Sequence, residues 1–170
     1  MENQVEIQKL NHLKKIEKYL VDEIIKFPHV NNRFRLVGHR PNSFVLGVQK
    51  VCGKYRVGRY MKEMRTLKLW VMLCDFMKTH YPDFFWNSVI VNKNNRFDIH
   101  KDSNNKEGTT SMVIGLGDYA GGDLKLYDDD KQVLFAVSVK CCPFFYDLKN
   151  TYHSVEEFIG DRYSLVFYSC

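Results

Sequence analysis

Apolar residues recur at helical spacing near the start of the chain. Between residues 4 and 27 most of them follow one another at steps of three or four: Val5, Leu10, Leu13, Ile16, Leu20, Ile24 and Phe27. This spacing places them on one face and predicts an amphipathic helix over residues 4–27, which Pro28 helps to end. Residues 62–80 predict a second helix, and its broad apolar surface indicates that it packs against a sheet.

Residues 43–51 and the part of the chain after Phe84 show a different pattern, of short apolar runs rich in β-branched and aromatic residues. Glycine, asparagine and aspartate separate these runs, which span residues 86–92, 109–117, 122–128, 132–139, 142–147 and 162–169. Several short strands at such spacing are typical of a sandwich or jelly roll. We therefore predict a single α+β domain over residues 1–170, with a helical support region (1–83) that braces a jelly-roll core (84–170).

Composition narrows the class of protein without identifying it. Hydrophobic residues make up 45% of the chain, which favours a packed core. No apolar run approaches the ~18 residues of a membrane span, and the polar start is unlike a signal peptide. The five cysteines form no Cys-x-x-Cys pair. These features predict an intracellular protein without a membrane partner, and we favour a monomer.

The net charge of +5 permits a polyanionic partner without requiring one. Basic residues gather in three places, over residues 33–40, 50–59 and 62–68. Such clusters are either phosphate-binding surfaces or ordinary solvated faces of the protein. Lys54 belongs to the second cluster and is a candidate contact to the phosphates of a nucleic acid.

The residues with the clearest chemistry are His100, Asp102, His153 and Arg162. Residues two apart on a strand face the same side, so His100 and Asp102 can reach one ion, with His153 as a third ligand. Two imidazoles and one carboxylate are the usual donors for non-haem Fe(II), and an arginine can clamp a carboxylate co-substrate. The alternative is a strand-end histidine beside a surface aspartate, with Arg162 in a surface salt bridge to Asp161 or Glu157.

The last predicted strand supports a pocket. Arg162, Ser164, Val166 and Tyr168 share one face of that strand, whereas Tyr163, Leu165 and Phe167 share the other. One face therefore mixes polar and aromatic groups, and the other is uniformly bulky. This pattern predicts a strand that lines a site on one side and fills a core on the other.

Three segments resemble a known family. His100-Lys101-Asp102-Ser103-Asn104-Asn105 is similar to the pattern H-R-D-x-x-N, and residues 114–124 resemble its glycine-rich turn and strand. Residues 162–168, RYSLVFY, are similar to R-x-S-L-V-F-Y. The chain thus resembles the 2-oxoglutarate/Fe(II) dioxygenase superfamily, with a double-stranded β-helix (jelly-roll) core. Within that superfamily it is most similar to the TET/JBP group, which oxidises methylpyrimidines in nucleic acid.

The resemblance implies a role for each matched residue. His100, Asp102 and His153 would bind Fe(II), with ascorbate as a possible supporting reductant. Arg162 would bind the distal carboxylate of 2-oxoglutarate with help from Ser164, and Arg33 or Arg35 is the candidate for an upstream arginine that also contacts it. The implied substrate is 5-methylcytosine or thymine in a polynucleotide, with DNA favoured over RNA.

The resemblance also assigns the base to Asn105, through hydrogen bonds, and to Tyr168, through stacking. Each has a simpler alternative, because Asn105 could cap the turn after His100-Lys101-Asp102 and Tyr168 could be ordinary core. The chain ends at Cys170, where animal members carry a histidine, and it lacks their cysteine-rich zinc-binding region. Two other functions stay open: a prolyl-type protein hydroxylase, and a non-catalytic nucleic-acid-binding module.

Overall fold

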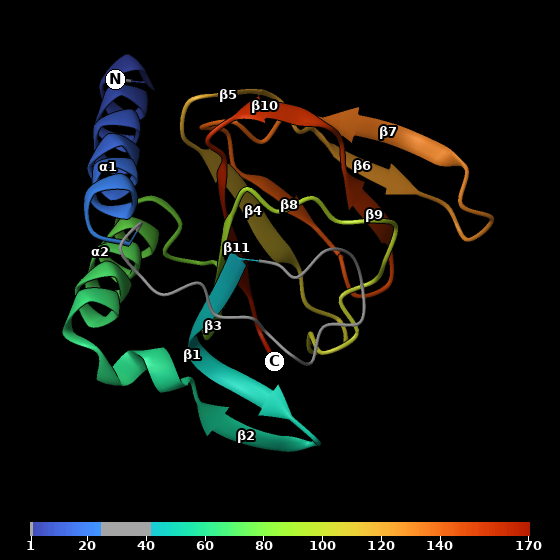
Figure 1. Ribbon diagram of the computed structural model, residues 1–170, viewed down its shortest axis with the longest axis horizontal. Helices are drawn as coiled ribbons and strands as arrows, with labels where there is room; N and C mark the ends of the chain where they lie inside the picture. The colour runs from blue at the N-terminus through green and yellow to red at the C-terminus, as the bar shows by residue number, and fades with distance from the viewer. Residues whose placement is uncertain (1, 25–41) are drawn as a thin grey trace.

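Two helices lie beside a set of antiparallel strands in the computed structural model, which describes residues 2–24 and 42–170 (Figure 1). Helix α1 spans Glu2–Asp22 and α2 spans Met64–His80, the latter preceded by a 3-10 turn, η2, at Arg59–Lys62. No helix in these residues is long and apolar enough to cross a membrane.

The strands form one large sheet, one small sheet and a separate pair. The large sheet has the order β2-β1-β3-β11-β4-β8, the small sheet has the order β7-β6-β9, and β5 pairs with β10. In chain order the strands are β1 (Asn42–Val51), β2 (Lys54–Val57), β3 (Ser88–Lys93), β4 (Ser111–Leu116), β5 (Tyr119–Gly121), β6 (Leu124–Tyr127), β7 (Val133–Val137), β8 (Phe144–Tyr146), β9 (Tyr152–Val155), β10 (Phe158–Gly160) and β11 (Tyr163–Tyr168). The helices plus these antiparallel sheets form the predicted α+β jelly-roll fold.

The helices cover the outer face of the large sheet. Both helices and strands β3, β4 and β11 contribute to one buried apolar cluster, whose members include Leu13, Ile16, Leu69, Leu73, Phe76, Val91, Ile114, Leu165 and Phe167. A second, smaller cluster lies between the two sheets and contains Val113, Leu124, Leu126, Val139 and Leu148. The large sheet is therefore packed on both faces, and its inner face looks toward the small sheet.

Strand β11 shows how the sequence produces this arrangement. Tyr163, Leu165 and Phe167 point into the core under the helices, whereas Val166 packs against the cluster between the sheets. The alternation along the last strand thus assigns one face to the helices and the other to the space between the sheets. The prediction made from its sequence pattern is confirmed.

The helix and strand predictions agree with the structure in most places. The first helix was expected over residues 4–27 and is described as Glu2–Asp22, while residues 25–27 and Pro28 lie outside the described residues. The second helix and the strand at 43–51 are confirmed within two residues at each end. Strands β2, β5 and β10 were not predicted, because each has only three or four residues and little buried apolar surface.

Candidate active site

Backbone pairing brings the two histidines of the predicted triad together. The N–H of His100 donates to the carbonyl oxygen of His153 at 3.0 Å, and the N–H of His153 donates back at 2.9 Å. The N–H of Asp102 donates to the carbonyl oxygen of Leu148 at 2.9 Å. The segment around His100 is therefore held against β9, on which His153 lies, although 53 positions separate the two histidines along the chain (153 minus 100).

The three side chains converge on one point. Asp102 Oδ1 lies 3.6 Å from His100 Nε2 and 3.9 Å from His153 Nε2, and the imidazole centroids are 4.2 Å apart. One ligand atom from each residue lies within 4.8 Å of the others, which makes this a group that could hold a metal ion. Two nitrogens and one oxygen suit Fe(II) or a similar divalent transition metal.

Hydrogen bonds to the backbone fix which nitrogen each histidine presents. His100 Nδ1 lies 2.7 Å from the carbonyl oxygen of Asp98, and His153 Nδ1 lies 3.0 Å from that of Thr151. A carbonyl oxygen only accepts, so each Nδ1 must carry the proton. The lone pairs of both Nε2 atoms are then free to face Asp102, as metal ligands require.

Burial favours the uncharged form of the second histidine. His153 is 4% exposed, and desolvation lowers its pKa, which the neighbouring Asp102 carboxylate opposes and the His100 imidazole lowers further. Because a metal ligand must be neutral imidazole, this environment prepares His153 for coordination. The donor set, the tautomers and the charge state therefore fit a divalent metal.

Arg162 is buried without a counter-ion among the described residues. Its side chain is 2% exposed and forms no ion pair among the described residues. Its guanidinium carbon lies 5.4 Å from the centre of the Tyr119 ring and 5.6 Å from that of Phe158, and its Nε has no hydrogen-bond partner. Burial lowers the pKa of Arg162, although arginine stays charged in proteins. A buried, unpaired guanidinium is costly, so the site is suited to an anion.

Gly122, the second glycine of the segment Gly121-Gly122-Asp123-Leu124, leaves room for this guanidinium. A Cβ at Gly122 would lie 2.9 Å from Arg162 Nε and 3.0 Å from its Cδ. Gly122 also has a φ of +75°, which residues with side chains rarely adopt. Nearby, the side chain of Asn94 accepts the backbone N–H of Arg162 at 2.7 Å and so fixes where β11 begins.

Ser164 lies two residues after Arg162, so its side chain is on the same face of the chain. Asn92 Nδ2 donates to Ser164 Oγ at 3.2 Å, and Asn95 Nδ2 donates to Asn92 Oδ1 at 3.3 Å. A polar chain from β3 therefore holds the serine hydroxyl on the face that carries Arg162. The hydroxyl can still donate to a ligand, because here it serves as the acceptor.

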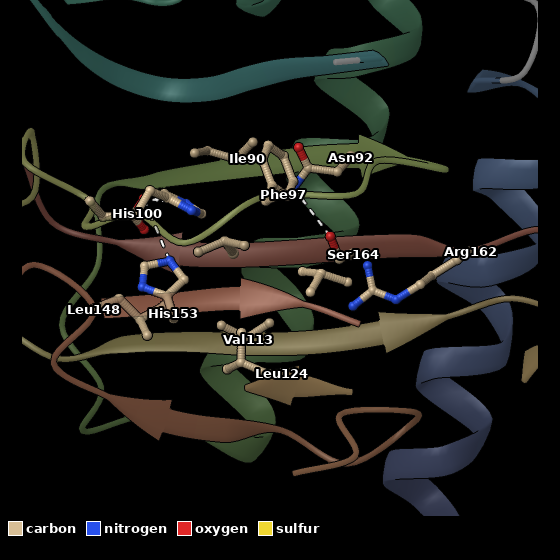
Figure 2. Close-up of a pocket in the computed structure, with 13 residues that line it drawn as sticks. Ile90, Asn92, Phe97, His100, Val113, Leu124, Leu148, His153, Arg162 and Ser164 are labelled. Atoms are coloured by element: carbon tan, nitrogen blue, oxygen red, sulfur yellow. Dashed lines mark hydrogen bonds and ion pairs between the residues drawn. The ribbon is translucent and has the colours of Figure 1, made fainter. Parts of the chain in front are cut away.

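A single cavity contains the triad, Arg162 and Ser164 (Figure 2). The histidines lie at one end of the cavity and Arg162 at the other, with aliphatic side chains between them. The remaining lining residues are Ile90, Asn92, Phe97, Val113, Leu124, Leu148, Val155 and Val166. An elongated anion could therefore bind Arg162 at one end and reach a metal at the other.

Comparisons with known proteins bear on the fold that carries this site. No protein-family model and no curated protein matches the sequence. Solved structures do match. The structure of OsALKBH1 has a TM-score of 0.58 at 12% identity, with 95% of this chain and 91% of that one covered. The chain has the fold of the 2-oxoglutarate/Fe(II) oxygenases.

Two further matches extend over the same fold. An oxidoreductase of the 2OG-Fe(II) oxygenase family from Burkholderia pseudomallei has a TM-score of 0.54 at 14% identity, with 92% of this chain and 76% of that chain covered. NgTET1 in complex with 5mC DNA has a TM-score of 0.56 at 14% identity, with coverages of 92% and 66%. The TM-scores of these matches support the oxygenase fold, whereas sequence identities this low leave the substrate open.

The other predicted site residues lie outside the cavity or outside the described residues. Asn105 is buried and donates from Nδ2 to Ser111 Oγ at 3.0 Å, and Tyr168 is buried two residues beyond Val166. Neither of them lines the cavity, so their contacts to a base stay predictions. Lys54 lies on the exposed strand β2, and Arg33 falls outside the described residues.

Sequence reasoning missed the residues that hold Arg162 and Ser164 in place. Asn92 is a buried polar residue that directly follows Val89–Val91 in β3, and its position at the end of an apolar run gave little sign that it would line the site. Tyr119 and Phe158 lie on the paired strands β5 and β10, and both of their rings lie near the guanidinium of Arg162. These two strands are only three residues long, so no periodic pattern pointed to them.

Proposed function

We propose that this chain is an Fe(II)- and 2-oxoglutarate-dependent dioxygenase. The observation that carries the proposal is the buried Arg162, which has no counter-ion and shares one cavity with the His100, Asp102 and His153 cluster. A dicarboxylate satisfies both ends at once, since one carboxylate pairs with the guanidinium and the other end can reach the metal. When bound, the metal would supply the activation of dioxygen.

The protein side chains then have defined tasks. Arg162 and Ser164 bind and orient the distal carboxylate, while the neighbouring rings of Tyr119 and Phe158 lie within cation–π distance of the guanidinium and limit its movement. The backbone carbonyls of Asp98 and Thr151 keep the proton on Nδ1 of each histidine. The aliphatic lining, including Val113, Leu124 and Val166, excludes water between the two ends of the cavity.

For the substrate we propose a methylated pyrimidine in a polynucleotide, with DNA favoured over RNA. The similarity of the fold to NgTET1, which was solved with 5mC DNA, and the sequence resemblance to the TET/JBP group support this choice. Asn105 and Tyr168 are the proposed base contacts. The bond to Ser111 uses one N–H of Asn105, so its second N–H and its Oδ1 remain for a base.

The test is product analysis after incubation with Fe(II) and 2-oxoglutarate. Methylated duplex DNA, methylated RNA and a proline-containing peptide are offered separately, and succinate and oxidised nucleosides are measured by mass spectrometry. We expect succinate together with hydroxymethylated pyrimidine from DNA. Succinate coupled only to peptide oxidation would overturn the substrate proposal and indicate a protein hydroxylase, whereas no succinate in any sample would overturn the oxygenase proposal itself.

A further inference from the structure

Strands β1 and β2 form a two-stranded ribbon that extends beyond the large sheet. Residues 42–47 of β1 pair with β3, whereas residues 48–51 pair only with β2, over four matched positions from Val48–Val57 to Val51–Lys54. We call residues 48–57 the basic ribbon. Figure 1 shows it projecting from the body of the molecule, close to the chain's C-terminus.

The turn at the tip of the basic ribbon is tight. Cys52 and Gly53 join the strands and have φ values of +50° and +75°. Positive φ at both positions of a two-residue loop is the type I′ arrangement, whose twist matches that of the flanking strands. The ribbon is therefore a regular hairpin rather than an irregular loop, and four residue pairs give it a reach of about 13 Å.

Every residue of β2 is exposed, and so is the tip of β1. Cross-strand partners share a face, so Lys50, Tyr55 and Val57 lie on one side of the ribbon. Lys54 and Arg56 lie on the other. Val48 and Gln49 at the base of the ribbon are half-buried, whereas both faces are open to solvent from Lys50 to Val57.

The charge of the ribbon has one sign. Between Asn42 and Lys62 the sequence contains Lys50, Lys54, Arg56, Arg59 and Lys62 and no acidic residue. None of the three cations within the ribbon forms an ion pair with a described residue, although Lys50 lies 5.8 Å from the centre of the Tyr55 ring. An exposed set of cations without ion-pair partners among the described residues fits a polyanion such as the phosphate backbone of a nucleic acid.

The base of the basic ribbon is connected by hydrogen bonds to the segments next to the end of the cavity where His100, Asp102 and His153 lie. The N–H of Val48 donates to the carbonyl oxygen of Asn87, and the N–H of Asn87 donates to that of Tyr168, both at 3.1 Å. The N–H of Lys106, next to Asn105, donates to the carbonyl oxygen of Ser169 at 2.8 Å. The base of the ribbon, the end of β11 and the loop after the triad thus meet at one edge, opposite the end of the strand that carries Arg162.

We infer that the basic ribbon enters the major groove of duplex DNA and holds the duplex beside the triad end of the cavity. The inference rests on the proposed function for its biological setting. The major groove of B-form DNA is about 12 Å wide and admits a two-stranded β-ribbon, whereas the major groove of duplex RNA is too deep and narrow for side chains to read. A ribbon that is open on both faces suits contact with the two groove walls, since Lys50 points to one and Lys54 and Arg56 to the other.

The test compares two variants of equal net charge in the full chain. The ribbon variant is Lys50→Gln/Lys54→Gln/Arg56→Gln, and the matched control is Lys14→Gln/Lys15→Gln/Lys18→Gln on α1. Fluorescence anisotropy measures their binding to a 20-bp duplex DNA, the same duplex as RNA, and one strand of the DNA, from 50 to 200 mM salt. Vesicles of phosphatidylcholine with or without phosphatidylserine are the final probe.

We expect the wild type to prefer duplex DNA and the ribbon variant to bind it at least ten-fold more weakly at 50 mM salt. Each phosphate contact contributes about 0.9 to the slope of log affinity against log salt, so losing two or three contacts should reduce that slope by about 2–3. The control should stay within two-fold of the wild type. Equal losses in both variants, no loss in the ribbon variant, tighter binding of duplex RNA or single strands, or binding to anionic vesicles alone would overturn the inference.

The outcome is separable from that of the proposed function. Metal and 2-oxoglutarate binding, measured by calorimetry without DNA, should be the same in wild type and ribbon variant. Normal binding of both with no ribbon-dependent DNA affinity would overturn the ribbon inference and leave the oxygenase proposal standing. Ribbon-dependent DNA affinity without 2-oxoglutarate binding would do the reverse.

Discussion

At the scale of single residues, Arg162 combines a stability cost with a binding role. Its guanidinium is desolvated, has no counter-ion among the described residues and lies beside two aromatic rings, so the protein keeps a charge where an apolar side chain would be more favourable. Residues kept at such a cost are typical of binding sites. The two histidines are also prepared for a ligand. Backbone carbonyls hold the Nδ1 protons of His100 and His153, which leaves both Nε2 atoms as donors to a metal.

The Arg162→Met variant separates stability from function. Removing the unpaired charge should raise the melting temperature of the ligand-free protein, while the loss of one buried charge pair should weaken 2-oxoglutarate binding by about 2–5 kcal/mol, or tens-fold or more. Thermal unfolding and calorimetric titration measure the two effects. A lower melting temperature together with unchanged 2-oxoglutarate affinity would mean that Arg162 is a structural residue.

At the scale of elements, strand β11 serves two different layers. Leu165 is 1% exposed in the core under the helices, whereas the neighbouring Val166 lines the cavity. Leu165→Ala should therefore lower the free energy of unfolding by about 2–5 kcal/mol, the usual cost of a buried leucine. Val166→Ala should cost less stability and should change turnover instead. Urea denaturation and succinate formation distinguish the two, and equal effects from both variants would contradict the division of faces.

The contact between α1 and α2 should be sensitive to pH through His80. Burial lowers its pKa below 6.5, His12 and Lys9 act in the same direction, Asp75 and Glu6 oppose them, and its Nε2 is buried without a hydrogen-bond partner. Below pH 6.5 the unfolded chain therefore takes up the proton more readily than the folded one. The stability present above that pH is lost as the pH falls toward the lower, folded-state pKa.

Urea denaturation between pH 7.5 and 5.5 tests this effect. The free energy of unfolding should decrease toward pH 5.5 in the wild type, and it should decrease less in His80→Gln. Parallel pH profiles for the two proteins would show that His80 keeps its ordinary pKa in the folded state. His153 also has a lowered pKa, but it is unchanged in the variant, so it cancels in the comparison.

At the scale of the whole molecule, sequence patterns within short segments predicted the helices and strands. The site itself is formed by pairing between segments that are far apart in the sequence. The apolar spacing of the helices and the alternation along β11 are local properties, so they could be interpreted directly. The bridge between His100 and His153 depends on how distant segments pair, so donor chemistry could group the two histidines as ligands without predicting the pairing that joins them. The bond between Asn105 and Ser111 also joins two separate segments, so the sequence pattern did not predict it, and the base contact of Asn105 stays a prediction. The exposed strand β2 buries no apolar face and left no pattern to detect.

The central claim is that His100, Asp102 and His153 bind one divalent metal and that 2-oxoglutarate joins it by way of Arg162. Anaerobic calorimetric titration with Fe(II), followed by 2-oxoglutarate, tests it most directly in the wild type, in Asp102→Ala and in Asp83→Ala, a control at an exposed aspartate outside the cavity. We expect one metal per chain in the wild type and the control, metal-dependent 2-oxoglutarate binding in both, and neither in Asp102→Ala. Unchanged metal affinity in Asp102→Ala, with the fold intact, would contradict the account.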